Sequence, residues 1–387
     1  MSVQFASRIN DLIPSGIRLI NEKALSMERI GRKVYHFELG RPDFDTPEYI
    51  KKACIDSINA GDVHYTSNFG KQDLRKEIAK YLNDKKNIPT RVDNILVTVG
   101  LAEAIFDVLA VLLEHGDEIL VPDPVWMNYI NIPKLLGANP ITYDLKEEND
   151  YQPDIAEIEE KITEKTKAIV IVSPHNPTGS MIEVDRIKEL AELAKKYDLV
   201  VISDEVYERL VYSEEKHISI ASLPHMFERT VTLNGYSKTY SMTGWRIGYV
   251  AASEEWIRNL NKIHQINTTS AASFVQTAAI AALTQEKDEV EAMRSEYQKR
   301  RDYVYEKINS IEGISCKKPV GAFYVFINIK KLGVSSEKFA NHLLDEYGIA
   351  MVPGTVFGHN GEGYIRMSFA NSLEELQAGL ELLERAI

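Results

Sequence analysis

Lys238 lies in a segment rich in Ser, Thr and Gly, NGYSKTYSMTGWRIGY, directly after the apolar run TVTLNG. A lysine in such a segment is most often a solvated charge. When a lysine is desolvated beside a second cation, its pKa falls, and the neutral amine can act as a nucleophile or form an imine. Arg246 begins the next apolar run and is a candidate for that cation, with an ordinary ion pair as its alternative role.

A carboxylate stands at the end of another apolar run, LVVISDEVY, where Asp204 is followed three residues later by Tyr207. Such a carboxylate commonly caps the next turn or helix. Its chemical alternative is to hold a heterocyclic nitrogen protonated, because an ion pair in a low dielectric favours the cation. Tyr207 would then donate a hydrogen bond to an oxygen on the same ring.

Two turns follow apolar runs and add donors. In SPHNPTG (173–179), two prolines fix the position of Asn176, whose amide could face a ligand. In VTVGLAEAIF (97–106), the chain passes through Gly100 into a helical pattern. The free N–H groups of such a helix start make a phosphate site possible, although glycine turns before helices are common.

The combination of these features is more specific than any one of them. An amine nucleophile, a carboxylate for a ring nitrogen, phenol and amide donors, a phosphate-binding turn and an arginine together suit pyridoxal phosphate (PLP). This cofactor is an electron sink held by a lysine imine and by a carboxylate–pyridinium pair. We expect no metal centre.

The elements that would position these residues are short β-rich runs alternating with helical patterns. The runs are uniformly apolar, which indicates strands buried on both faces of a mainly parallel sheet covered by helices. Binding residues collect at the carboxyl ends of such strands. The expected strands cover 94–99, 118–122, 140–144, 168–173, 199–205, 230–235 and 246–252.

The C-terminal part differs in character. A long charged helix is expected over about 285–310, then a strand at 322–329, a helix at 335–346, a strand at 364–370 and a last helix capped by Ser372 with Glu375. We therefore predict an α/β protein with a three-layer α/β/α large domain over 46–284 and a smaller α+β domain over 285–387. Residues 1–45 would pack with the small domain.

Composition excludes several classes of protein. The 387 residues are 44% hydrophobic and 26% charged, as in ordinary globular proteins, and the net charge of −12 disfavours nucleic-acid binding. No apolar run is long enough to cross a bilayer, and the N-terminus does not resemble a signal peptide. Cys54 and Cys316 are isolated, which favours two free thiols over one disulfide. A cytoplasmic protein is expected.

The blocks NPTG, SDEVY and SKTYSMTGWRIG, in this order, together with GRPDFDTP and YIRMSFA, resemble the PLP-dependent class I (fold-type I) aminotransferases, in particular the bacterial aspartate and aromatic types. The resemblance covers essentially the whole chain. It implies that Lys238 forms the internal aldimine and moves the substrate proton. Asp204 would contact the pyridine nitrogen, while Tyr207 and Asn176 would bind the phenolic oxygen.

The resemblance also implies how the rest of the site is built. The phosphate would be bound by Gly100, Leu101, Ala102, Ser237 and Arg246, and Trp126 would stack on the ring. Arg366 would clamp the substrate α-carboxylate, with Gly40, Trp126 and Asn176 beside it. Tyr65 would reach the phosphate of the neighbouring subunit, so a homodimer is expected.

Three positions depart from common family patterns. Gly235 is often serine in relatives, Ala102 falls where some aspartate aminotransferases have a lysine, and Arg41 replaces a common glutamate or glutamine. The second departure weakens an aspartate-specific interpretation. We hypothesise that Arg41 or Arg18 recognises a distal acidic group.

The expected reaction moves the amino group of an L-amino acid to a 2-oxo acid, 2-oxoglutarate being the expected acceptor, with ping-pong kinetics. A C–S β-lyase would share the same cofactor residues and stays an alternative. A non-catalytic regulator built on the same fold is disfavoured, because the chain has no spare basic segment for a DNA-binding domain.

Overall fold

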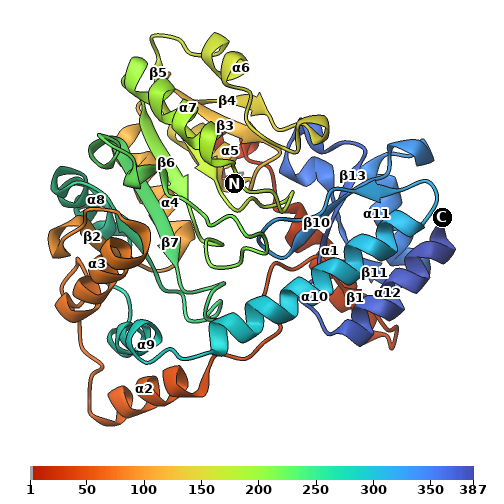
Figure 1. The fold of residues 1–387 in the computed structure, drawn as a ribbon, viewed down its shortest axis with the longest axis horizontal. Coiled ribbons are helices and arrows are strands. Elements are labelled where there is room, and N and C mark those ends of the chain that lie inside the picture. The colour runs from red at the N-terminus through yellow and green to blue at the C-terminus, as the bar shows by residue number, and fades with distance from the viewer. Residues whose placement is uncertain (1–2) are drawn as a thin grey trace.

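In the computed structural model, which describes residues 3–387, a seven-stranded sheet has the order β2-β8-β7-β6-β5-β3-β4 (Figure 1). Neighbouring strands are parallel except at β8, which runs antiparallel to both β2 and β7. β2 therefore points the same way as β7. The strands are β2 (Ile95–Thr98), β3 (Glu118–Asp123), β4 (Asn139–Asp144), β5 (Thr166–Val172), β6 (Val200–Asp204), β7 (Thr230–Gly235) and β8 (Gly248–Ala251).

Helices cover both faces of this sheet, because alternate residues of each strand enter different hydrophobic clusters. In β5, Ala168 and Val170 pack with α4, α5 and α8, whereas Ile169 and Ile171 pack with α7. This arrangement confirms the predicted mainly parallel, doubly covered sheet. The covering helices are α3 (Gln72–Lys86), α4 (Leu101–Leu112), α5 (Asn128–Leu136), α6 (Ile155–Glu160), α7 (Val184–Lys196), α8 (Glu254–Asn267) and α9 (Ser273–Thr284). α2 (Glu48–Asn59) lies beside α9 (Figure 1).

A second, antiparallel sheet has the order β12-β13-β10-β9 and belongs to the C-terminal part of the chain. Its strands are β9 (Ser315–Cys316), β10 (Tyr324–Asn328), β12 (Val352–Pro353) and β13 (Tyr364–Ser368). The helices of this part are α10 (Glu289–Ser310), α11 (Ser336–Tyr347) and α12 (Leu373–Ala386). Ser372 accepts the N–H of Glu375 at 3.2 Å, as expected for the N-cap of α12.

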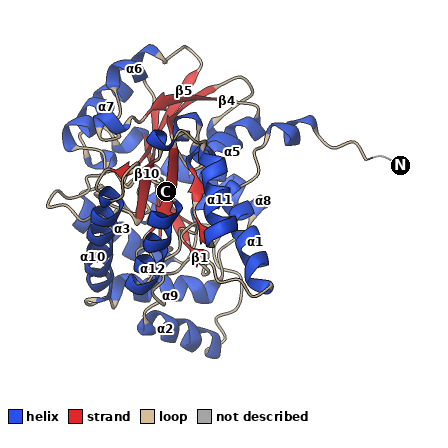
Figure 2. Ribbon diagram, turned by 90° about the vertical axis from the view of Figure 1, so that its right-hand side faces the viewer, coloured by secondary structure: helices blue, strands red, loops and turns tan. Residues whose placement is uncertain are grey.

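The N-terminal segment is fastened to this C-terminal part. β1 (Tyr35–His36) pairs in parallel with β11 (Ile349–Ala350), and α1 (Gly16–Arg29) packs against β11 and β12. Figure 2 shows α1 beside α11, with the described residues before α1 extending away from the body. The boundaries at residues 46 and 285 stay predictions.

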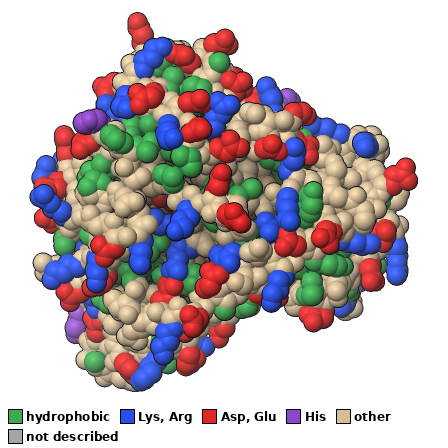
Figure 3. Space-filling view, viewed as in Figure 1, with side chains coloured by type: hydrophobic (Ala, Val, Ile, Leu, Met, Phe, Trp, Pro, Cys, Tyr) green, Lys and Arg blue, Asp and Glu red, His purple; other side chains and the backbone are tan. Residues whose placement is uncertain are grey.

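The surface mixes charges of both signs. Over the face in Figure 3, Lys and Arg are interspersed with Asp and Glu, so the net charge of −12 does not form one acidic field there. Cys54 and Cys316 are buried and unbonded. Among residues 3–387, no helix combines the length and the apolar character needed to cross a bilayer.

Candidate active site

The sheet topology brings the predicted residues to one edge. β2, β5, β6 and β7 all point the same way, so their carboxyl ends lie together. Gly100 follows β2, Asn176 follows β5, Asp204 ends β6 and Lys238 follows β7. The loop between β7 and β8 leaves and re-enters the sheet at the paired residues Gly235 and Gly248.

Lys238 reaches from this loop to the N-terminal segment. Its Nζ donates a hydrogen bond to the carbonyl oxygen of Gly40 at 2.5 Å. Burial, helped by the positive charges of Arg366 and Arg246, lowers the pKa of Lys238 to about 8, and the charge of Asp204 acts in the opposite direction. A substantial fraction of this amine is therefore neutral near pH 8, as a nucleophile requires.

Asp204 is buried, with 4% of its surface exposed. Tyr129 donates its phenolic hydrogen to Oδ2 at 2.9 Å, and the Val206 N–H donates to Oδ1 at 3.2 Å. Burial raises the pKa of Asp204 to about 6, although both hydrogen bonds and Lys238 lower it. A buried carboxylate of this kind favours an adjacent cation, because the ion pair offsets the cost of burying the charge.

Tyr207 and Asn176 each contact another polar side chain of the protein. The Tyr207 hydroxyl lies 2.7 Å from the Tyr324 hydroxyl, and the Asn176 Oδ1 accepts from Arg366 Nη1 at 3.1 Å. Lys238 Nζ lies 5.9 Å from the centre of the Tyr207 ring, so Lys238 and Tyr207 are close neighbours.

Arg366 comes from β13 of the smaller sheet and is only 1% exposed. Its Nη2 donates to the backbone carbonyl of Glu38, and the guanidinium lies over the rings of Tyr324 and Phe357. Its Nε has no hydrogen-bond partner among residues 3–387. A buried guanidinium with a spare donor is suited to bind a carboxylate.

The turn from β2 into α4 forms a cradle for an anion. Gly100 has a φ of +75°, and a Cβ at this position would collide with Arg246 Nη2 and lie 2.8 Å from its Cζ. Within residues 3–387 no side chain caps α4, so the N–H groups of Leu101 and Ala102 are available at its start. Arg246 has a φ of +54°, an uncommon conformation for a residue with a side chain.

The remaining predicted residues differ in their exposure. Trp126 is partly buried and packs against the cluster that contains α4 and α5, and Ser237 directly precedes Lys238 and is partly buried. Tyr65 is 90% exposed. Arg18 and Arg41 are also exposed. At Gly235, a Cβ would lie 3.1 Å from the Cα of Gly248, so this strand pair leaves little room for a side chain.

Sequence reasoning missed several residues that contact this centre. Tyr129 and Tyr324 lie in α5 and β10, where a tyrosine is unremarkable, and each contacts a predicted site residue only through the tertiary fold. Glu103 is a further residue of this kind. Its carboxylate accepts the N–H of Val99 in the cradle turn and lies 2.9 Å from Nδ1 of His264. Only its place three residues after Gly100 could have indicated it.

These residues fit PLP. Asp204 keeps unused acceptor positions beside its two hydrogen bonds, Arg366 keeps a free Nε, and the Gly100 turn faces Arg246 with no Cβ between them. The donors, the carboxylate and the amine thus match the phosphate, the ring nitrogen and the aldehyde carbon of that cofactor.

Comparisons with known proteins agree with this geometry. The family described as "Aminotransferase class I and II" matches residues 32–383. An aspartate aminotransferase from Pyrococcus abyssi is 40% identical over 385 residues, covering 99% of this chain and 98% of that protein. An aromatic-amino-acid aminotransferase from Thermococcus litoralis is 38% identical, with coverage of 99% and 98%. The solved structure of an aspartate aminotransferase from Thermus thermophilus with maleate has a TM-score of 0.96 at 33% identity, covering 100% of both chains.

Because these matches span nearly the whole chain, the protein belongs to the class I and II aminotransferases, which are PLP-dependent transaminases of fold type I.

Proposed function

We propose that this transaminase moves the amino group of an L-amino acid to 2-oxoglutarate in two half-reactions at one site, with ping-pong kinetics. The observation that carries the proposal is that the Lys238 amine and the Asp204 carboxylate, at the carboxyl edge of the large sheet, meet the Arg366 guanidinium from β13 of the smaller sheet. Their charges act on one another, since Arg366 and Asp204 shift the Lys238 pKa in opposite directions.

Bound PLP supplies a pyridinium ring into which negative charge from the substrate Cα can spread. Lys238 would hold the cofactor through its amine, and once released by the substrate amine it would take the proton from the substrate Cα and move it to the cofactor carbon on the far side of the imine nitrogen. A pKa of about 8 lets the Lys238 amine accept and give up a proton near neutral pH. Asp204 would keep the ring nitrogen protonated, while Tyr207 and Asn176 would donate hydrogen bonds to the ring oxygen.

Arg366 binds the substrate α-carboxylate in a bidentate manner, with the backbone of Gly40 beside it. Asn176 and Glu38 already fix two of its nitrogens, so little side-chain entropy is lost on binding. Trp126 stacks on the ring. The phosphate is bound by Gly100, Leu101, Ala102, Ser237 and Arg246.

The proposed enzyme is a cytoplasmic homodimer. Two unbonded thiols suit a reducing compartment. Tyr65 is 90% exposed and would complete the phosphate site of the neighbouring subunit. Each active site would then contain residues of both chains.

The proposed amino donors are aspartate and aromatic amino acids, on which the relatives named above act. Arg41 follows Gly40, whose carbonyl oxygen lies 2.5 Å from Lys238 Nζ, so Arg41 is our first candidate for contacting a distal carboxylate. Arg41→Ala should lower kcat/KM for dicarboxylic donors and leave kcat/KM for aromatic donors unchanged. Arg18→Ala tests the alternative candidate in the same assay. Unchanged kinetics for every dicarboxylic substrate would exclude Arg41.

The test of the function is a panel of L-amino acids assayed against 2-oxoglutarate and pyruvate. We expect double-reciprocal plots of rate against one substrate, at several fixed concentrations of the other, to give parallel lines. We also expect the Lys238→Ala protein to retain cofactor but lose turnover. Near-normal transamination by Lys238→Ala would refute the assignment. Release of pyruvate and ammonia from cystathionine without an added oxo acid would favour the C–S β-lyase instead.

A further inference from the structure

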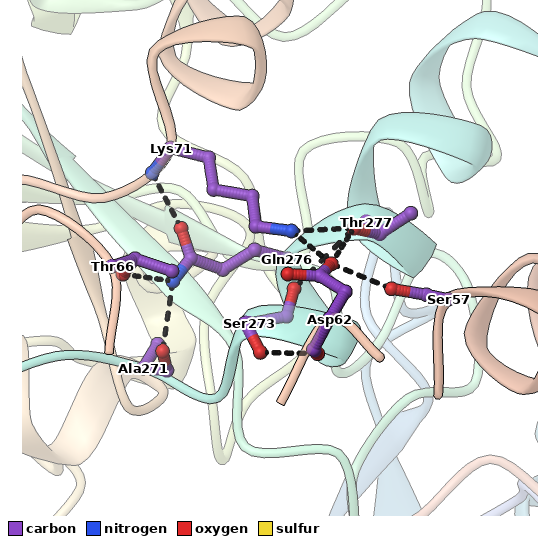
Figure 4. Close-up of polar contacts among 8 residues, drawn as sticks. All are labelled: Ser57, Asp62, Thr66, Lys71, Ala271, Ser273, Gln276 and Thr277. Carbon is purple, nitrogen blue, oxygen red and sulfur yellow. Dashed lines mark hydrogen bonds and ion pairs between the residues drawn. The ribbon is translucent and has the colours of Figure 1, made fainter. Parts of the chain in front are cut away.

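The segment 60–71 carries the exposed Tyr65 and is fastened to α9 by a network of polar side chains (Figure 4). We call this network the brace. It consists of Ser57, Asp62, Thr66, Lys71, Ser273, Gln276 and Thr277. None of these residues has a role in the chemistry described above.

Asp62 fixes one end of the segment. Its Oδ2 accepts hydrogen bonds from Ser57 at 2.6 Å and from Thr277 at 3.0 Å, and it forms an ion pair with Lys71. Its backbone carbonyl accepts from Ser273 at 2.6 Å. The Lys71 hydrogen bond holds the pKa of Asp62 below its usual range, so the ion pair persists at neutral pH.

Gln276 fixes the other end and is fully buried. Its Oε1 accepts the backbone N–H of Lys71 at 2.6 Å, and its Nε2 donates to Thr66 at 3.0 Å and to the carbonyl of Ala271 at 2.8 Å. Both polar atoms of the amide are therefore engaged. Thr66, which is adjacent to Tyr65, is thus tied to the body of the protein.

The apex of the segment is exposed, in contrast to its two hydrogen-bonded ends. Tyr65 is 90% exposed and Val63 is 54% exposed, so the apex makes few contacts of its own within the subunit. The brace fixes the path of the backbone around Tyr65 without using the Tyr65 side chain. A hydrogen bond to a ligand depends on placement within about 0.5 Å, which rigid support of this kind provides.

We propose that Asp62, Lys71 and Gln276 are positioning residues that hold Tyr65 in place for the cofactor phosphate of the neighbouring subunit. The inference rests on the proposed function, in which Tyr65 crosses to that subunit. The brace acts on the partner's site through Tyr65 and has no effect on the site of its own subunit.

The first experiment measures the rate of PLP release from the holoenzyme, together with thermal unfolding and oligomeric state. Tyr65→Phe sets the reference, and we expect release about tenfold faster, as for the loss of one hydrogen bond to a charged group. Asp62→Asn and Gln276→Met should approach that rate. Lys52→Met is the matched control, because it removes an exposed ion pair of α2 outside the brace, and it should release PLP at the wild-type rate.

A double variant separates positioning from general destabilisation. Because the brace acts through Tyr65, adding Gln276→Met to Tyr65→Phe should increase PLP release less than twofold further. A fully additive effect would overturn the inference. If Gln276→Met does not fold, Gln276→Glu keeps the acceptor and removes the donors, and the same comparison applies.

Hybrid dimers supply the decisive comparison. In one hybrid, Lys238→Ala and Asp62→Asn are on the same chain. The intact site, which keeps Lys238, then belongs to the unaltered chain and receives Tyr65 from the chain whose brace is disrupted. In the other, they are on different chains, so the intact site receives a braced Tyr65. We expect the intact Lys238 site, followed by its imine absorbance, to lose PLP fast and to show a raised KM only in the first hybrid.

The outcomes distinguish the proposed role of Tyr65 in the neighbouring site from the positioning role of the brace. If Tyr65→Phe leaves PLP release unchanged, or if the protein is a monomer, the proposed role of Tyr65 fails and the inference fails with it. If Tyr65→Phe accelerates release but the brace variants do not, or if the second hybrid is the impaired one, only the inference is overturned.

Discussion

The phenolic hydroxyl of Tyr129, on α5, donates a hydrogen bond of 2.9 Å to Oδ2 of Asp204, at the end of β6. The two residues are both buried, and this hydrogen bond lowers the pKa of a carboxyl group that burial raises to about 6. Tyr129 therefore helps to keep Asp204 ionised at neutral pH. Under the proposed function, ionised Asp204 in turn keeps the cofactor nitrogen protonated.

Replacing Tyr129 with phenylalanine should lower kcat/KM by about tenfold, the usual effect of removing one hydrogen bond to a charged group. The loss should be larger below about pH 7, because the pKa of Asp204 rises when the bond is removed. Tyr143→Phe is the control, since that buried tyrosine donates at 2.8 Å to the Val170 carbonyl, away from the site. Equal losses of kcat/KM in the two variants would contradict the role given to Tyr129.

The pKa of Lys238 predicts how the apoenzyme recombines with PLP. Only the neutral amine attacks the aldehyde, so the recombination rate should rise with pH through a midpoint of about 8. Arg366→Met removes one of the cations that lower this pKa, and the midpoint should move upward. Arg258→Met, at an exposed position on α8, should leave it in place. An unchanged midpoint in Arg366→Met would show that Arg366 does not act on the amine.

The cradle turn predicts a difference between two glycine substitutions. Gly100 and Gly116 both have a positive φ, +75° and +88°, so alanine is strained at either position. At Gly100 the new Cβ would collide with Arg246, whereas at Gly116 no atom of the described residues lies within 4 Å. Gly100→Ala should therefore weaken PLP binding by at least about tenfold beyond the effect of Gly116→Ala, measured by absorbance titration. Equal affinities in the two variants would argue against the cradle.

His36 predicts a pH-dependent contribution to stability. A hydrogen bond to buried Glu38, with further contributions from Glu28, raises the pKa of His36 to about 8 although burial lowers it. Because the folded pKa exceeds the unfolded value of about 6.5, the stabilisation is complete below about pH 6.5 and is lost as the pH rises through about 8.

We expect this group to contribute about 1–2 kcal/mol, since its side chain is about one-quarter exposed. The difference in unfolding free energy between wild type and His36→Gln, from urea titrations, should shrink by that amount between about pH 6 and about pH 9. A difference independent of pH would contradict the assignment.

The sequence was sufficient to predict the main features of the fold and the placement of the chemistry. Uniformly apolar runs such as 168–173 form buried strands, and Ser372 caps the last helix, because these properties depend on neighbouring residues alone. Asp204 and Lys238 meet because parallel strands end at one edge. Their catalytic roles stay predictions.

Contacts between distant segments could not be predicted in the same way. The Tyr207–Tyr324 contact, the Asn176–Arg366 hydrogen bond and the Tyr129–Asp204 hydrogen bond join residues 75 to 190 positions apart. Such pairs depend on strand order and on how the two sheets approach each other, which local periodicity does not encode. The brace is not predictable from local sequence for the same reason, because it joins the segment before α3 to α9.

Lys238 is tested most sharply as the cofactor-binding lysine by reducing the holoenzyme with borohydride and locating the cofactor by peptide mass spectrometry. We expect the visible absorbance to disappear and the reduced cofactor to be attached to Lys238 in the peptide containing GYSKTY. Attachment to another lysine, or a holoenzyme with no reducible bond, would contradict it.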